Sequence, residues 1–176
     1  MTLIEIAIAL PIMLVALGMF VQMLGAGSIL RKGATEEWAA VCAAQDTFER
    51  MRNEELSEVF KLYNADPFDD PMGPGTAPGH RFEIPGLTPL EGEEFVGEVF
   101  LPVIETGTSV VPVWELREDS DHIRLGAPRD LNGDAMIDDL DHAEDYSLLP
   151  IGIEVRWMSG HGPRLVRLQT VLTEYH

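Results

Sequence analysis

The chain has 176 residues, 45% of them hydrophobic, and 30 acidic side chains against 12 basic ones give a formal net charge of −18. An acidic surface of this kind repels nucleic-acid phosphates, so the composition argues against a nucleic-acid-binding protein. The single cysteine, Cys42, excludes an intramolecular disulfide bond. The length fits one globular domain with an additional N-terminal segment.

Residues 1–30 form an apolar segment in which Glu5 is the only charged side chain before Arg31. A helix from Ile6 to Leu30 would be roughly 37 Å long, which is enough to cross the ~30 Å hydrocarbon core of a bilayer. A cleavable signal peptide has a basic N-terminal region and a shorter apolar run of about 7–15 residues. The segment therefore predicts a transmembrane helix.

The carboxylate of Glu5 is costly among apolar side chains, so the sequence predicts a specific cationic partner for it. If Met1 is a mature N-terminus, its α-amine lies about one helical turn from Glu5 in the same chain. The amine of a neighbouring chain is a second candidate partner. A third interpretation is that Glu5 is solvated at the level of the lipid headgroups.

The sequence Thr2-Leu3-Ile4-Glu5 ahead of an apolar helix resembles the N-terminus of type IV pilins and type II secretion pseudopilins. The resemblance implies that prepilin peptidase removes a basic leader, that Met1 is then methylated, and that the chain resides in the inner membrane before assembly. It also implies that Glu5 meets the amine of an adjacent subunit, with Met1 and Thr2 at the assembly contact. The apolar helices would then pack as the core of a filament.

Four residues of the apolar segment are candidates for a helix break. Pro11 removes one backbone hydrogen bond and is expected to kink or loosen the helix. Gly18, Gly25 and Gly27 can do the same, or can let neighbouring helices approach closely. Many pilins have a proline near the twenty-second position, where this chain has Gln22, so the position of the break differs from the usual pattern.

Residues 31–63 continue the helical pattern but become amphipathic, with apolar residues at three- and four-residue steps. The segment Gln45–Asn53 also resembles the minor-pilin and minor-pseudopilin branch of the family. One long helix is thus expected to begin in lipid and to end by packing on a domain. The apolar positions of this stretch include Trp38, Val41, Cys42, Phe48 and Met51.

Residues 64–176 are expected to form a β-rich globular head. The head begins with an exposed loop, 64–79, whose four prolines and three glycines exclude a helix or a central strand. Short β-type runs follow, and the last two are predicted to pair as an antiparallel hairpin. The fold class predicted is α+β, a pilin-like lollipop in which a long N-terminal helix packs on an antiparallel β-sheet. The runs are 81–84, 94–104, 109–116, 148–157 and 165–172.

Residues 130–141 have the spacing of an EF-hand or dockerin-like calcium loop, with oxygen-bearing side chains at positions 1, 3, 5, 9 and 12. A calcium ion (Ca2+) takes six to eight oxygen ligands, which alternate residues of a tight loop can supply. We expect the ion to have a structural role, pinning a loop that has no disulfide. An acidic turn that binds no ion is the alternative. The candidate ligands are Asp130, Asn132, Asp134, Met136 through its carbonyl, Asp138 and Asp141.

Two positions of this loop depart from the usual pattern. Asp141 replaces the glutamate common at position 12, so its carboxylate reaches less far. Ala135 occupies a position where glycine normally adopts a left-handed conformation, at a cost of roughly 1 kcal/mol. Acidic residues near the loop could add a ligand; these are Glu118, Asp119, Asp121, Glu144 and Asp145.

The remaining polar residues do not indicate a catalytic site. The five histidines lack the spacing of metal ligands on a helix, and each is expected to be a surface or loop residue. No nucleophile-elbow, P-loop or dinucleotide-binding motif is present, so we do not expect an enzyme. The histidines are His80, His122, His142, His161 and His176.

These patterns favour a structural subunit of an extracellular type IV pilus-like filament on the bacterial cell surface. The subunits would be copies of this chain, assembled through their N-terminal helices and stabilised by bound calcium. Two alternatives stay open. One is a minor pseudopilin that caps the pseudopilus of a type II secretion-like system, and the other is a membrane-anchored calcium-binding module that does not polymerise.

Overall fold

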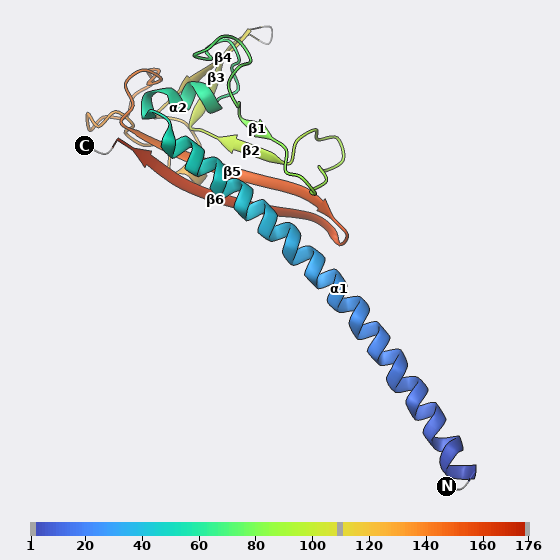
Figure 1. Cartoon of the computed structure of the whole chain (residues 1–176). Coiled ribbons are helices and arrows are strands. Elements are labelled where there is room, and N and C mark those ends of the chain that lie inside the picture. Colours follow the sequence, from blue (N-terminus) through green and yellow to red (C-terminus); the bar gives the residue numbers. More distant parts are fainter. Residues whose placement is uncertain (1–2, 109–110, 175–176) are drawn as a thin grey trace. The chain divides into compact units, whose positions relative to one another are not determined.

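The computed structural model describes residues 3–108 and 111–174 (Figure 1). The chain divides into two compact units, Met1–Trp38 and Ala39–His176. A long N-terminal helix and antiparallel strands make up the structure, so the predicted α+β class is confirmed. The elements are α1 (Leu3–Asn53), α2 (Leu56–Tyr63), β1 (Arg81–Phe82), β2 (Gly97–Phe100), β3 (Val103–Thr108), β4 (Val111–Leu116), the 3-10 turn η1 (Ile123–Leu125), β5 (Leu148–Ser159) and β6 (Gly162–Thr173).

The first unit consists of the N-terminal part of α1. Every side chain described between Ile4 and Leu30 is exposed, and the most apolar stretch has a mean hydropathy of 2.3. By length and composition this helix is suited to cross a membrane, as predicted, and a signal sequence, against which the sequence argued, would have the same properties. Among the described residues it is the one helix with this property.

The predicted helix-breaking residues all lie within continuous helix. Helix α1 is uninterrupted through Pro11 and through Gly18, Gly25 and Gly27. A Cβ atom added at any of these three glycines would meet nothing within 4 Å in the described part of the chain, so packing there does not require them. A break at these positions during assembly stays a prediction.

The amphipathic helix is shorter than predicted and is followed by a second one. Helix α1 ends at Asn53, where the Glu54 N–H donates to the Met51 carbonyl instead of continuing the helical ladder, and Glu55 is extended. The chain then turns into α2, which buries Val59 and Phe60. The expectation of one uninterrupted helix to residue 63 was therefore wrong at this joint.

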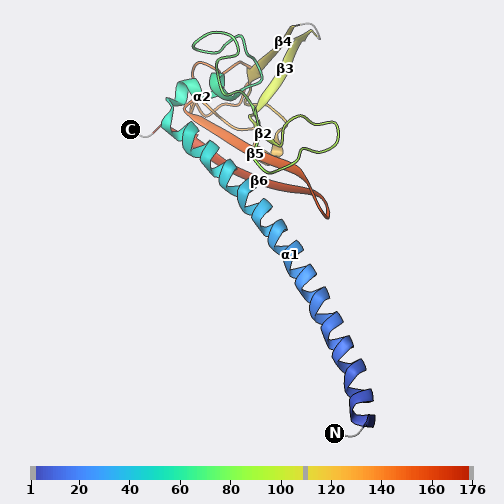
Figure 2. The same ribbon diagram turned by 45° about the vertical axis from the view of Figure 1, so that its right-hand side comes forward.

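The second unit is built on a four-stranded antiparallel sheet of order β1-β2-β5-β6, with β3 and β4 paired as a separate hairpin. Strands β5 and β6 form the predicted C-terminal hairpin, in register from Leu148 opposite Thr173 to Ser159 opposite Gly162. Both views show these two strands beside the C-terminal part of α1 (Figure 2). The predicted run 94–104 is divided at Pro102, between β2 and β3.

The core of the second unit lies between the end of α1, helix α2 and the sheet. Helix α1 contributes residues at four- and three-residue steps, and β5 contributes alternate apolar residues. The small alanine side chains of α1 let its backbone approach closely, whereas Trp38, one of the predicted apolar positions, is 70% exposed. The main core residues are Ala40, Ala44, Phe48, Met51, Ile151, Ile153, Val155 and Trp157.

Candidate metal centre

The connection between β4 and β5 contains both the predicted calcium loop and an acidic cluster. It includes only the short turn η1 as regular structure, so side chains and main-chain turns position its residues. The Asn132 side chain accepts a hydrogen bond from the Asp134 N–H at 3.0 Å, and Asp134 accepts one from the Met136 N–H at 2.7 Å. These two hydrogen bonds hold residues 132–136 in tight turns.

Asp130, at the first position of the loop, organises the tightest turn. Its Oδ1 accepts from the Gly133 N–H at 2.6 Å, and its Oδ2 accepts from the Ala135 N–H at 2.8 Å. Ala135 has a φ of 67°, the left-handed conformation predicted for this position from the sequence. A side chain here carries strain that glycine would avoid.

The twelfth position of the loop has an additional structural contact. The Asp141 Oδ1 accepts hydrogen bonds from the Leu116 N–H at 3.0 Å and from the Ala143 N–H at 3.1 Å. The His142 N–H donates to the Leu116 carbonyl at 2.9 Å. These contacts attach the end of the loop to the last residue of β4.

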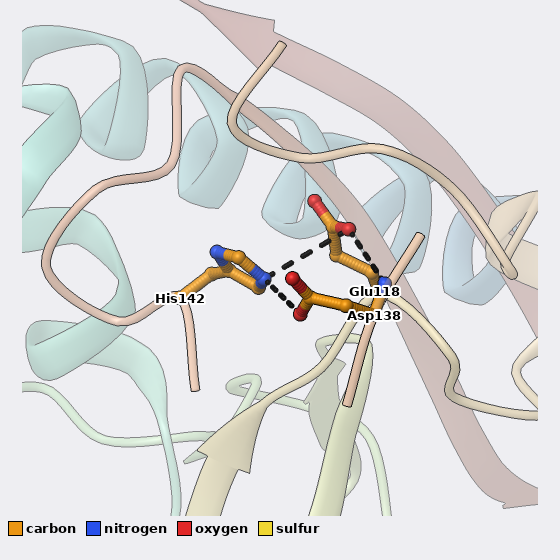
Figure 3. Close-up of side chains that lie close together, drawn as sticks. All are labelled: Glu118, Asp138 and His142. Carbon is orange, nitrogen blue, oxygen red and sulfur yellow. Dashed lines mark hydrogen bonds and ion pairs between the residues drawn. The ribbon is translucent and has the colours of Figure 1, made fainter. Parts of the chain in front are cut away.

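A compact group of ligand atoms lies beside the loop and consists of Glu118, Asp138 and His142 (Figure 3). The three side chains each offer an atom within 4.8 Å of the others, and among the described residues this is the one such group of His, Cys, Asp or Glu. The His142 Nε2 lies 3.1 Å from the Asp138 Oδ1 and 3.8 Å from the Glu118 Oε2. Asp138 is the one predicted calcium ligand in the group.

Glu118 is a buried carboxylate that accepts hydrogen bonds from backbone N–H groups of the loop. Only 1% of its surface is exposed. Its Oε1 accepts from the Leu131 N–H at 2.6 Å and lies 3.4 Å from the Asn132 N–H, and its Oε2 accepts from the Asp138 N–H at 3.3 Å. Hydrogen bonds to a carboxylate are stronger than neutral ones and offset part of its desolvation.

His142 lies in a loop, which agrees with the expectation of a surface or loop residue, but its side chain is buried. Burial lowers the pKa of His142, but hydrogen bonds with Asp138 and Asp145 and the charge of Glu118 outweigh burial, and the net pKa is raised above 6.5. The pKa of Asp138 is lowered, chiefly by the Leu140 N–H that donates to its carboxylate at 2.9 Å. The neighbouring carboxylates therefore favour the protonated, positively charged form of His142.

Sequence reasoning found some members of this group and missed others. Glu118 was one of five acidic neighbours without a specific role, and His142 was not considered a ligand. The available signal was the four-residue step from Asp138 to His142 at the end of the loop. The position of Glu118 comes from the fold, since it follows β4 and lies 20 residues before Asp138.

The predicted assembly residues belong to the first unit. Glu5 lies in the first turn of α1 and is exposed, whereas Met1 and Thr2 lie outside the described residues. Comparisons with protein-family models, with curated proteins and with solved structures found no match to the chain. The resemblance to pilins therefore stays a prediction from the N-terminal sequence motif.

Proposed function

We propose that the chain is a structural subunit of an extracellular, type IV pilus-like helical filament, with a pilin-like arrangement of N-terminal helix and β-rich head. The N-terminal helices of many copies would form the filament core, and the heads would form its outer layer. The observation that carries the proposal is a long exposed apolar helix that begins with a carboxylate in its first turn.

The exposed apolar surface of α1 requires a non-aqueous environment. Ile4, Met13 and Met23 are 69%, 70% and 76% exposed, and the side chains described between them are also exposed. Burying one large apolar side chain contributes roughly 1.5–3 kcal/mol, so a segment of this length strongly favours lipid or neighbouring helices over water. The inner membrane would provide the first environment and a filament core the second.

Glu5 would fix the register between neighbouring helices, which apolar contacts alone do not determine. Apolar helices can slide along one another at little cost, whereas a carboxylate held in an apolar core favours the one register that places it beside a cation. The N-terminal amine of an adjacent subunit, exposed by prepilin peptidase, would be that cation. Methylation of the amine would leave its positive charge in place.

The loop 130–141 would bind calcium and stabilise the head. Its donor set is suited to a hard cation, because Asp130, Asn132, Asp134 and Asp138 offer side-chain oxygens and Met136 offers a carbonyl. Asp141 would offer the carboxylate oxygen that does not bind the backbone of β4. The ion would reduce repulsion among acidic residues in a chain of net charge −18.

Substitution of Glu5 tests the proposal in cells that produce the protein naturally. We expect Glu5→Leu to insert in the membrane normally and to reduce filament yield at least tenfold, measured by electron microscopy with antibody labelling. The matched control is Glu37→Leu, the same change at an exposed position of α1 beyond the apolar segment. Normal filament yield from Glu5→Leu would refute the argument that Glu5 sets the register of the helices. Antibody labelling of the wild-type chain at filament tips alone would indicate a minor subunit instead.

A further inference from the structure

The group of Glu118, Asp138 and His142 has a chemistry that the calcium loop does not share. It combines an imidazole nitrogen with two carboxylates, and both Glu118 and His142 are at least 97% buried. Calcium and magnesium ions prefer oxygen ligands throughout, whereas imidazole with carboxylate suits zinc and related transition-metal ions. The ligand types therefore distinguish this group from the oxygen-only loop.

The spacing of the three side chains fits a small ion. Around a tetrahedral zinc ion with bonds of about 2.0–2.2 Å, neighbouring ligand atoms are separated by roughly 3.4 Å. The His142 Nε2 lies 3.1 Å from Asp138 Oδ1 and 3.8 Å from Glu118 Oε2, on either side of this value. Figure 3 shows the imidazole nitrogen directed toward both carboxylates. Small side-chain movements are enough to admit an ion.

His142 is oriented by a residue outside the group. Its Nδ1 lies 3.0 Å from the Asp145 Oδ1, so a proton on Nδ1 can be donated to this carboxylate. Such a bond fixes the tautomer in which Nε2 has a free lone pair, and metal-binding histidines are commonly oriented by a carboxylate in this way. The Nε2 atom is the one that faces Asp138 and Glu118.

We propose that Glu118, Asp138 and His142 bind a zinc-type divalent cation at a site that adjoins the calcium loop and shares Asp138 with it. The ion connects the residue that follows β4 with the last part of the loop, and it replaces the contacts that a protonated His142 makes. A water molecule fills the fourth coordination position of the ion. The proposal does not depend on filament assembly, and it does not require the loop to bind calcium, although the shared Asp138 would couple the two ions if both were bound.

Zinc binding to the full-length chain in detergent, produced without a histidine tag, tests the site. We expect calorimetric titration with zinc chloride, in calcium-free buffer, to show one site, and calcium is titrated in a separate experiment. We expect His142→Gln and Glu118→Gln each to lower the zinc affinity of this site at least tenfold. The matched control His161→Gln, at an exposed histidine, leaves zinc affinity unchanged. The control Asp130→Asn also leaves zinc affinity unchanged but weakens calcium, so failures of the two ion sites are distinguishable.

X-ray absorption at the zinc edge provides a measurement on the wild-type chain, in case Glu118→Gln does not fold. The expected spectrum shows one imidazole nitrogen with the remaining ligands oxygen. Absence of zinc binding by the wild-type chain would overturn the proposal. So would unchanged affinity in both variants, or a spectrum with two or more imidazole ligands, which would place the ion at other histidines.

Discussion

The backbone N–H of Phe60 donates a hydrogen bond to the Tyr146 hydroxyl at 3.1 Å, across 86 residues of sequence. The same hydroxyl donates to the Leu56 carbonyl, so it lies between the two groups that a regular helical turn would join directly. Tyr146 precedes β5, and both Phe60 and Leu56 belong to α2. One side chain thus joins the short helix to the connection that holds the candidate metal centre.

Tyr146→Phe removes this link and is expected to lower the free energy of unfolding by about 1 kcal/mol. The Phe60 N–H and Leu56 carbonyl recover only part of the loss by bonding to each other. The matched control is Tyr63→Phe, since Tyr63 is also buried but its hydroxyl makes no hydrogen bond among the described residues. Chemical denaturation of the purified chain in detergent measures both. Equal costs for the two variants would show that the bridging hydroxyl has no special role.

Gly97 is required by a close approach of an aromatic ring. It lies opposite Phe82 in the register of β1 and β2, and a Cβ atom at position 97 would overlap the Phe82 ring. We expect Gly97→Ala to cost about 1–3 kcal/mol, because the ring must leave its position over the strand. Gly160→Ala, where a Cβ atom meets nothing within 4 Å, is the control. In a Phe82→Ala background the cost of Gly97→Ala should fall, and a cost that stays constant would contradict this origin.

The sequence was sufficient to predict local conformations, but it was not sufficient to predict which side chains cluster in the fold. The left-handed conformation of Ala135 follows from its position in a known loop spacing, and strand β5 of the C-terminal hairpin follows from the alternation of apolar residues along 151–157. Both depend on a few consecutive residues. Local spacing is therefore a reliable guide to them.

Burial and clustering depend on contacts between distant segments. The helix pattern made Trp38 as good a core candidate as Phe48, but Trp38 is 70% exposed, whereas Phe48 belongs to the core with Ala40 and Ala44. Glu118 reaches Asp138 and His142 because the connection after β4 folds back on itself. No periodic pattern in the sequence predicts that this connection folds back, so the cluster could be identified only from the structure.

Asp69 in the loop 64–79 predicts a specific pH dependence. One of its oxygens accepts from the Asn64 side chain at 2.6 Å, and the other is buried without a hydrogen-bond partner among the residues that the structure describes. Burial raises the pKa of Asp69 above 3.8, and the hydrogen bond from Asn64 opposes this only in part. The folded state therefore holds this proton more tightly than the unfolded state does, and the ionised carboxylate lowers stability at neutral pH.

We expect Asp69→Asn to raise the melting temperature at pH 7, because it removes the buried charge and keeps an acceptor for Asn64. The advantage should shrink as the pH falls through the raised pKa and disappear below the unfolded value of about 4, where both chains are neutral at this position. Asp46→Asn, at an exposed acid, serves as the control. Thermal melts between pH 3 and pH 7 measure the effect, and a gain that does not depend on pH would exclude this mechanism.

Ala135 links the strain of the loop to calcium binding. Its φ of 67° is costly for alanine, and Ala135→Gly should release roughly 1 kcal/mol of this strain, reduced by the greater freedom of glycine in the unfolded chain. If the loop binds calcium as proposed, the variant should also bind the ion more tightly, because less strain opposes the binding conformation. Ala143→Gly is the matched control, since Ala143 does not have a positive φ and glycine should weaken the structure there.

Thermal melts with calcium and with a calcium-selective chelator separate these two effects. Chelation should lower the melting temperature of the wild-type chain, and re-addition of calcium should restore it. Ala135→Gly should melt higher than wild type in the chelator and gain at least as much from calcium. A wild-type melting temperature that ignores the chelator would contradict calcium binding by the loop. The Ala135→Gly gain in chelator would still report the strain by itself, because that strain belongs to the backbone and requires no ion.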